Sequence, residues 1–118
     1  MGKVVFSTRK VVTESGVFLV TTEQPSVIER GHAGRFQAQF EHLNDGLITP
    51  TSPTLKIYEG ETLKATPALT NDGPGIYFAD YTVPATDKVG RQIAEWTGTY
   101  SGLSLQVRRP FRVVRTVS

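Results

Sequence analysis

The stretch Gly73-Pro74-Gly75-Ile76-Tyr77-Phe78-Ala79-Asp80-Tyr81-Thr82-Val83-Pro84 is the most strand-like part of the chain and decides its fold class. Aromatic and β-branched residues fit a pleated, half-buried surface, while Gly and Pro end the strand on both sides. We therefore predict a central strand of a β-sandwich, with Tyr77, Tyr81 and Val83 facing the core. Ile76 and Phe78 then face outward together, which predicts that the N-terminal hairpin or a neighbouring subunit covers them.

The composition indicates a single turn-rich β domain. A chain of 118 residues with 11 Gly, 7 Pro and 38% apolar residues is long enough for one core and suits strands better than helices. Cysteine is absent, which excludes disulfides and thiolate metal sites. The sequence has no apolar run of the length that a signal peptide or a transmembrane helix needs. We therefore expect a protein that stays inside the cell that makes it and does not enter a membrane.

The N-terminal residues predict a β-hairpin. Residues 3–12 and 17–23 are β-rich runs joined by Thr13-Glu14-Ser15-Gly16, a short connection that ends in Gly. An isolated hairpin is only marginally stable in water, so residues 1–24 are expected to pack on the chain's own sandwich or, as an assembly arm, on another chain. The sandwich itself is expected over residues 25–118. The hairpin residues that are interface candidates are Val4, Phe6, Val12, Phe18 and Val20.

The remaining strands follow from the distribution of apolar and polar residues. Residues 35–41 alternate strictly and place Phe36, Ala38 and Phe40 on one face. In residues 92–100 the pattern leaves both faces open, and we expect Trp96 to face inward because a Trp supplies much of the core area of a small sandwich. Residues 103–113 alternate as well, but Arg109 interrupts the apolar face next to Pro110. Because Pro cannot donate to a ladder, a bulge or an edge site is expected there. Seven or so short strands without a helix indicate an all-β, two-sheet antiparallel sandwich.

The C-terminal residues are strongly basic. Residues 103–118 carry four arginines and no acidic residue, so this end is suited to nucleic acid or an acidic protein patch, or is simply a solvated strand face. No sequence-specific contact with nucleic acid is expected. The further interface candidates are the four arginines, Arg108, Arg109, Arg112 and Arg115, and the outward-facing pair Ile76 and Phe78, which we call the apolar step.

From about Val27 to Val114 the chain resembles the stand-alone immunoglobulin-like modules of bacteria and phages. The residues that carry the resemblance are Gly75–Pro84, Gly90, Trp96-Thr97-Gly98 and Phe111-Arg112-Val113-Val114. The resemblance implies an immunoglobulin-like (fibronectin-III-like) sandwich, to which the N-terminal hairpin is an addition. The chain departs from immunoglobulin domains proper in lacking the paired cysteines, and from the usual Gly-Thr-Tyr start of the Trp-bearing strand in having Gly90-Arg91-Gln92.

Such modules occur as tandem arrays on bacterial surfaces, behind a secretion signal, and as virion structural proteins of tailed phages. A single module with its own Met1, no signal and an extra hairpin looks more like the second setting. The resemblance therefore implies a non-enzymatic virion protein that works as a symmetric homo-oligomer. Its place would be the neck or head–tail connection, or a capsid or tail decoration, in contact with other virion proteins. Such a protein is assembled in the host cytoplasm and then resides in the virion.

The main alternative is a module that binds carbohydrate or a host surface. Exposed aromatic residues would form such a site, and the candidates are Tyr58, Phe78 and Tyr100.

The sequence gives little support for an enzyme or a metal-binding domain. The two histidines, His32 and His42, stand apart from any nucleophile or acidic cluster. The aspartates lack the dense spacing of a calcium loop. We therefore expect no catalytic residue, no metal ligand and no cofactor.

Overall fold

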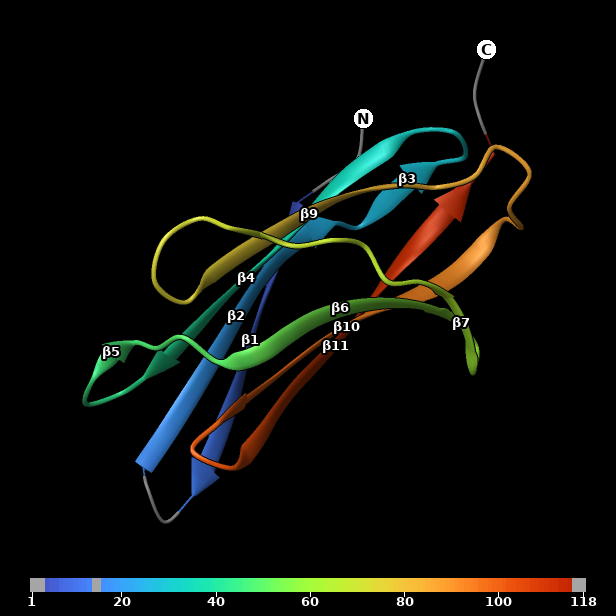
Figure 1. Ribbon diagram of the computed structural model, residues 1–118. Coiled ribbons are helices and arrows are strands. Elements are labelled where there is room, and N and C mark those ends of the chain that lie inside the picture. Colours follow the sequence, from blue (N-terminus) through green and yellow to red (C-terminus); the bar gives the residue numbers. More distant parts are fainter. Residues whose placement is uncertain (1–3, 14–15, 116–118) are drawn as a thin grey trace.

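The computed structural model describes the backbone of residues 4–13 and 16–115 and the side chains of residues 18–115. These residues form two β-sheets and no helix (Figure 1). The first sheet contains β1 (Val4–Thr13), β2 (Gly16–Pro25), β4 (Ala33–His42), β5 (Gly46–Leu47), β8 (Thr70–Asn71) and β9 (Ile76–Thr82). The second sheet contains β3 (Val27–Glu29), β6 (Thr51–Glu59), β7 (Thr62–Ala65), β10 (Gly90–Tyr100) and β11 (Leu103–Val114).

The strand order is β1-β2-β4-β9-β8 in the first sheet, with β5 beside β4, and β3-β11-β10-β6-β7 in the second. Every pair is antiparallel except β3 with β11, which is parallel. The all-β, two-sheet architecture predicted from the sequence is therefore confirmed. It is the layered arrangement of a β-sandwich, in which each sheet buries one face against the other.

The core lies between the two sheets and follows the predicted alternation. Phe36, Ala38 and Phe40 of β4 are fully buried, and so is Trp96 of β10. Tyr77, Tyr81 and Val83 also face the core, as predicted for the opening stretch. Because successive side chains of a strand point to opposite faces, burial of these residues turns their neighbours outward.

The stretch Ile76–Thr82 is not the central strand that the sequence predicts. It forms β9, which pairs with β4 on one side and on the other only with the two-residue strand β8. The face of each side chain was predictable, because it follows from local alternation. The position of the strand in the sheet depends on pairing with residues far away in sequence, and residues 66–72 form too short a strand to cover the edge of β9.

The predicted N-terminal hairpin is present, and its second strand is part of the sandwich. β1 pairs with β2 from Val4↔Pro25 to Thr13↔Gly16, and β2 pairs with β4 over Phe18–Glu23. The inward residues of β2 are fully buried in the core: Phe18, Val20, Thr22 and Gln24. Of the two packing arrangements that the sequence left open, the structure has the hairpin on the chain's own first sheet.

The irregularity predicted at Arg109 and Pro110 is an edge site. β10 and β11 pair without a register shift from Gly90↔Val113 to Tyr100↔Leu103, so no bulge interrupts them. β3 pairs only with Arg112–Val114, which leaves the other edge of β11 without a described strand partner at Pro110. Instead, the side-chain amide of Gln24 donates a hydrogen bond to the Pro110 carbonyl at 3.1 Å and links the two sheets.

The Gly-Pro-Gly turn before β9 requires glycine at its last position, Gly75. Gly75 has a φ of 74°, and its carbonyl accepts a hydrogen bond from the Phe40 N–H at 2.8 Å. A Cβ atom at this position would lie 2.5 Å from the Ile48 carbonyl oxygen and 2.7 Å from that of Phe40. Only glycine therefore permits the turn to approach β4 this closely.

Candidate functional site

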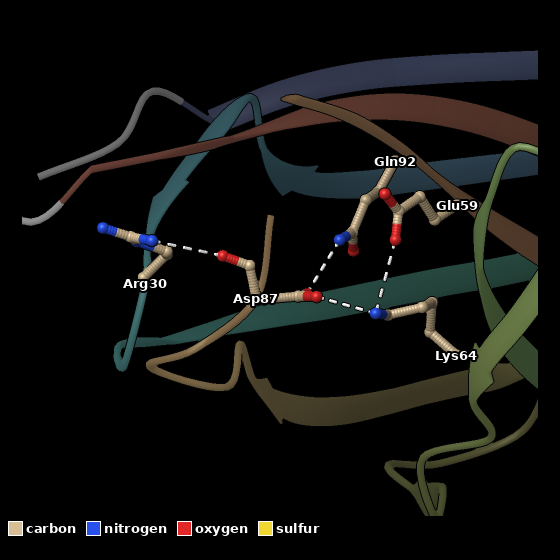
Figure 2. Close-up of polar contacts among 5 residues, drawn as sticks. All are labelled: Arg30, Glu59, Lys64, Asp87 and Gln92. Atoms are coloured by element: carbon tan, nitrogen blue, oxygen red, sulfur yellow. Dashed lines mark hydrogen bonds and ion pairs between the residues drawn. The ribbon is translucent and has the colours of Figure 1, made fainter. Parts of the chain in front are cut away.

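The most connected polar cluster surrounds Asp87 at one end of the sandwich (Figure 2). The Asp87 carboxylate is buried and accepts hydrogen bonds from the Lys64 ammonium at 2.7 Å and from the Gln92 amide at 2.9 Å. Lys64 also forms an ion pair with Glu59 at 3.3 Å. The Arg30 guanidinium donates to the backbone carbonyl of Asp87 at 3.3 Å. This cluster joins the loop before β10 to β6, β7 and the turn after β3.

The pKa values of Asp87 and Lys64 indicate a structural role for this cluster. Burial alone would raise the pKa of Asp87, but the hydrogen bonds from Lys64 and Gln92 outweigh burial and lower this pKa. The hydrogen bond to Asp87 raises the pKa of Lys64 despite its partial desolvation. Both groups are therefore charged and mutually satisfied at neutral pH. A general acid or base would instead need a pKa close to the working pH, so we assign the cluster a role in stability.

The outer face of the first sheet contains the apolar step predicted from the sequence. Ile76 and Phe78 of β9 lie on this face and are half-buried. The Arg35 guanidinium lies 4.2 Å from the centre of the Phe78 ring and forms two hydrogen bonds to Asp80, at 2.8 and 3.0 Å. The hydrogen bond from Arg35 also lowers the pKa of Asp80. Phe78 is thus partly covered from within the chain.

The outer face of the second sheet carries a row of apolar side chains that crosses four strands. The register places Leu63 of β7 opposite Tyr58 of β6, Tyr58 opposite Ile93 of β10, and Ile93 opposite Pro110 of β11. Leu63 is 49% exposed, Pro110 is exposed, and the two residues between them are half-buried. We call these four residues the apolar row. At about 4.8 Å between strands, the row is roughly 14 Å long.

Charged residues flank the apolar row on both sides. On one side Arg91 lies opposite Arg112, and no ion pair among the described residues includes either of them. On the other side Glu95 lies between Lys56 and Arg108. Arg108 pairs with Glu95 at 3.4 Å and lies 5.8 Å from the Tyr58 ring centre. An apolar centre with a charged rim is the usual composition of a protein-binding surface.

The first sheet also has a long unpaired edge. β1 is the outermost strand of this sheet, and its ten residues pair with β2 on one side only among the described residues. An open edge of this length presents unpaired backbone donors and acceptors that can add another strand. The edge is therefore a second candidate for contact with another chain.

The interface residues predicted from the sequence do not form one surface. Phe18 and Val20 are 1% exposed and lie in the core, where they contact the chain's own sandwich. Val4, Phe6 and Val12 belong to β1, and their side chains lie outside the described residues.

The four C-terminal arginines are divided as well. Arg108 and Arg112 lie on the outer face of the second sheet, and Arg115 follows β11 and is exposed. Arg109 has the parity of the core-facing residues, is half-buried, and has a buried Nε without a hydrogen-bond partner among the described residues. The sequence singled out the arginines but not the apolar row, because the row joins residues from four strands and depends on their register.

The aromatic residues considered for carbohydrate binding lie on three different parts of the molecule. Tyr58 is on the outer face of the second sheet, and Phe78 is on that of the first, beneath Arg35. Tyr100 packs edge-on against Phe18 at 5.7 Å. A flat platform of these three rings is therefore not formed, and a glycan site remains an untested prediction.

Two further features of the described residues bear on function. They contain no group of three or more His, Asp or Glu side chains arranged to hold a metal ion, and they form no helix that could span a membrane. His42 is buried beside Phe18, and its Nδ1 accepts hydrogen bonds from the N–H groups of Asn44 and Asp45 at 3.2 and 3.3 Å. It therefore organises the turn after β4.

No family model matches the chain, and no curated protein matches it.

Proposed function

We propose that the chain is a non-enzymatic structural protein of a tailed-phage virion that works as a symmetric homo-oligomer. Its place is the neck or head–tail connection, or a decoration of the capsid or tail, where it also contacts other virion proteins. The phage setting rests on the sequence resemblance described above. The assembly role is supported by surfaces of the sandwich that are suited to binding protein.

The immunoglobulin-like topology that this proposal includes is supported by the strand order. Immunoglobulin sandwiches hold strands A, B, E and D in one sheet and C, F and G in the other, which C′ can extend. Here β2, β4, β9 and β8 follow the first order, and β11, β10, β6 and β7 follow the order G, F, C, C′. Trp96, however, lies on the strand in position F rather than in position C.

The observation that carries the proposal is the ten-residue edge of β1. Monomeric β proteins shorten, bend or cover their edges, because an open edge invites pairing with another chain. In this chain β1 extends the sheet beyond β2 and leaves its outer side unpaired among the described residues. Strand addition at this edge would join subunits through backbone hydrogen bonds.

Proline substitutions in β1 test this mechanism. Successive N–H groups of a strand point to opposite edges, so of Thr8→Pro and Arg9→Pro one disrupts pairing with β2 and the other removes a donor from the open edge. The variant that keeps the wild-type melting temperature is expected to sediment as a smaller species than the wild type. If that variant and the wild type have equal oligomeric mass, strand addition at β1 does not hold the subunits together.

A further inference from the structure

The two outer faces of the sandwich carry opposite charges. On the outer face of the second sheet Lys56, Arg91, Arg108 and Arg112 stand against Glu29 and Glu95, a formal net charge of +2. The charged side chains described on the outer face of β2, β4 and β9 in the first sheet are Glu23, Glu41, Asp80 and Arg35, a formal net charge of −2. We call these two surfaces the basic face and the acidic face.

Both faces also have apolar centres. The basic face holds the apolar row, which extends from Leu63 to Pro110. The acidic face holds Ile76 and Phe78 on β9, with the half-buried Leu19 and the 41% exposed Leu47 at its other end. The charges around these apolar groups are positive on one face and negative on the other. The two faces are therefore complementary to each other in both hydrophobicity and electrostatics.

From this complementarity we infer that the basic face of one copy docks on the acidic face of the next. The inference rests on the proposed function, for which it names a contact other than the β1 edge. The contact is heterologous, because two basic faces would repel one another in a two-fold arrangement. Repeated around an axis, a heterologous contact builds a ring if the rotation closes.

The faces are large enough for a stable contact. The molecule measures 50 × 25 × 21 Å, so a broad face exceeds the roughly 800 Å² that each partner buries in a complex of standard size.

Arg91 and Arg112 are the most informative residues on the basic face. They lie directly opposite one another, and a like-charge cross-strand pair is unfavourable unless an anion is brought to it. A carboxylate of the neighbouring copy would supply that anion.

Charge reversal on one face at a time gives a direct test. The double variant Arg91→Glu with Arg112→Glu makes both faces acidic, and Glu23→Lys with Glu41→Lys makes both faces basic. All four positions are on outer faces, so both variants are expected to fold. Lys88→Glu and Glu61→Lys make charge reversals at exposed sites away from both faces and serve as controls.

The two variants are examined by sedimentation velocity alone and as an equimolar mixture. Each alone is expected to be smaller than the wild type, because its two faces repel. In the mixture copies of the two variants can alternate, so that each basic face meets an acidic one. Association beyond that of either variant alone is therefore expected, and the wild-type mass returns if the ring has an even number of subunits. Raising salt from 0.1 to 1 M shortens the Debye length from about 10 Å to about 3 Å and should weaken the wild-type assembly.

The outcomes separate this inference from the proposed function. If the wild type assembles while both single-face variants keep its mass, or if the mixture associates no further than the variants alone, the docking of basic on acidic faces is wrong. Assembly through the β1 edge would then remain. If the wild type is a monomer of 13.0 kDa at every concentration, the proposed homo-oligomer itself is wrong. Circular dichroism melting of each variant confirms that it is folded before its mass is interpreted.

Discussion

At the residue scale, Asp87 is the charged side chain on which most polar contacts converge. Its carboxylate is buried and is the common acceptor for Lys64 and Gln92. We expect Asp87→Ala to lower the free energy of unfolding by about 1–3 kcal/mol, because it leaves the buried amide of Gln92 without its acceptor. Urea denaturation measures the change, with the exposed Lys88→Ala as a control that should stay within about 0.5 kcal/mol of the wild type. Equal losses in the two variants would show that the cluster contributes no stability.

The same carboxylate predicts how stability depends on pH. The hydrogen bonds of the folded state hold the pKa of Asp87 below its ordinary value of 3.8. A lowered pKa stabilises the protein at pH values above 3.8, and this contribution is lost as the pH falls through the native pKa. Urea midpoints between pH 7 and pH 3 are therefore expected to fall less steeply in Asp87→Asn than in the wild type. Parallel pH profiles would contradict this assignment.

At the element scale, the turn that begins β9 depends on Gly75. We expect Gly75→Ala to destabilise the chain by more than about 2 kcal/mol, because the added Cβ meets two backbone carbonyl oxygens that cannot rotate away. Gly73 also has a positive φ, but a Cβ there meets nothing within 4 Å. Gly73→Ala is therefore the matched control and should cost only about 1 kcal/mol. Thermal melting of both variants checks the difference, and equal shifts would count against the close approach to β4.

The N-terminal hairpin gives a second prediction at this scale. A chain truncated to residues 25–118 is expected to be unfolded, because it lacks β2 and with it Phe18 and Val20. Each of these buried side chains is worth about 1.5–3 kcal/mol, against a typical total stability of 5–15 kcal/mol. A chain truncated to residues 16–118 keeps β2 and should fold. Near-ultraviolet circular dichroism distinguishes the two, and a cooperative melt of residues 25–118 would show that the hairpin is a separate arm.

The strands also show which features of the fold can be predicted from the sequence alone. Alternation placed Phe36 and Phe40 in the core correctly, because the side-chain period of a strand is two whatever its neighbours are. Alternation did not decide the face of Trp96, whose buried position was predicted from its size. Alternation could not place β9 within its sheet or reveal β5 and β8, which have two residues each and show no periodicity. The apolar row could not be predicted from the sequence either. Its residues become neighbours only through the register of β7, β6, β10 and β11.

At the scale of the whole molecule, the sandwich combines an open edge with two faces of opposite charge. The edge of β1 offers backbone hydrogen bonds, and the faces offer apolar centres with complementary rims. These surfaces point in different directions, so in the proposed assembly one subunit contacts several neighbours at once. That capacity is what a ring or a surface lattice requires.

Sedimentation velocity of the wild-type protein across a concentration series tests self-association most directly. The proposed function predicts a discrete species whose mass is a small multiple of 13.0 kDa and persists on dilution into the micromolar range. A single species of 13.0 kDa at all concentrations, from a protein with a cooperative melt, would contradict it.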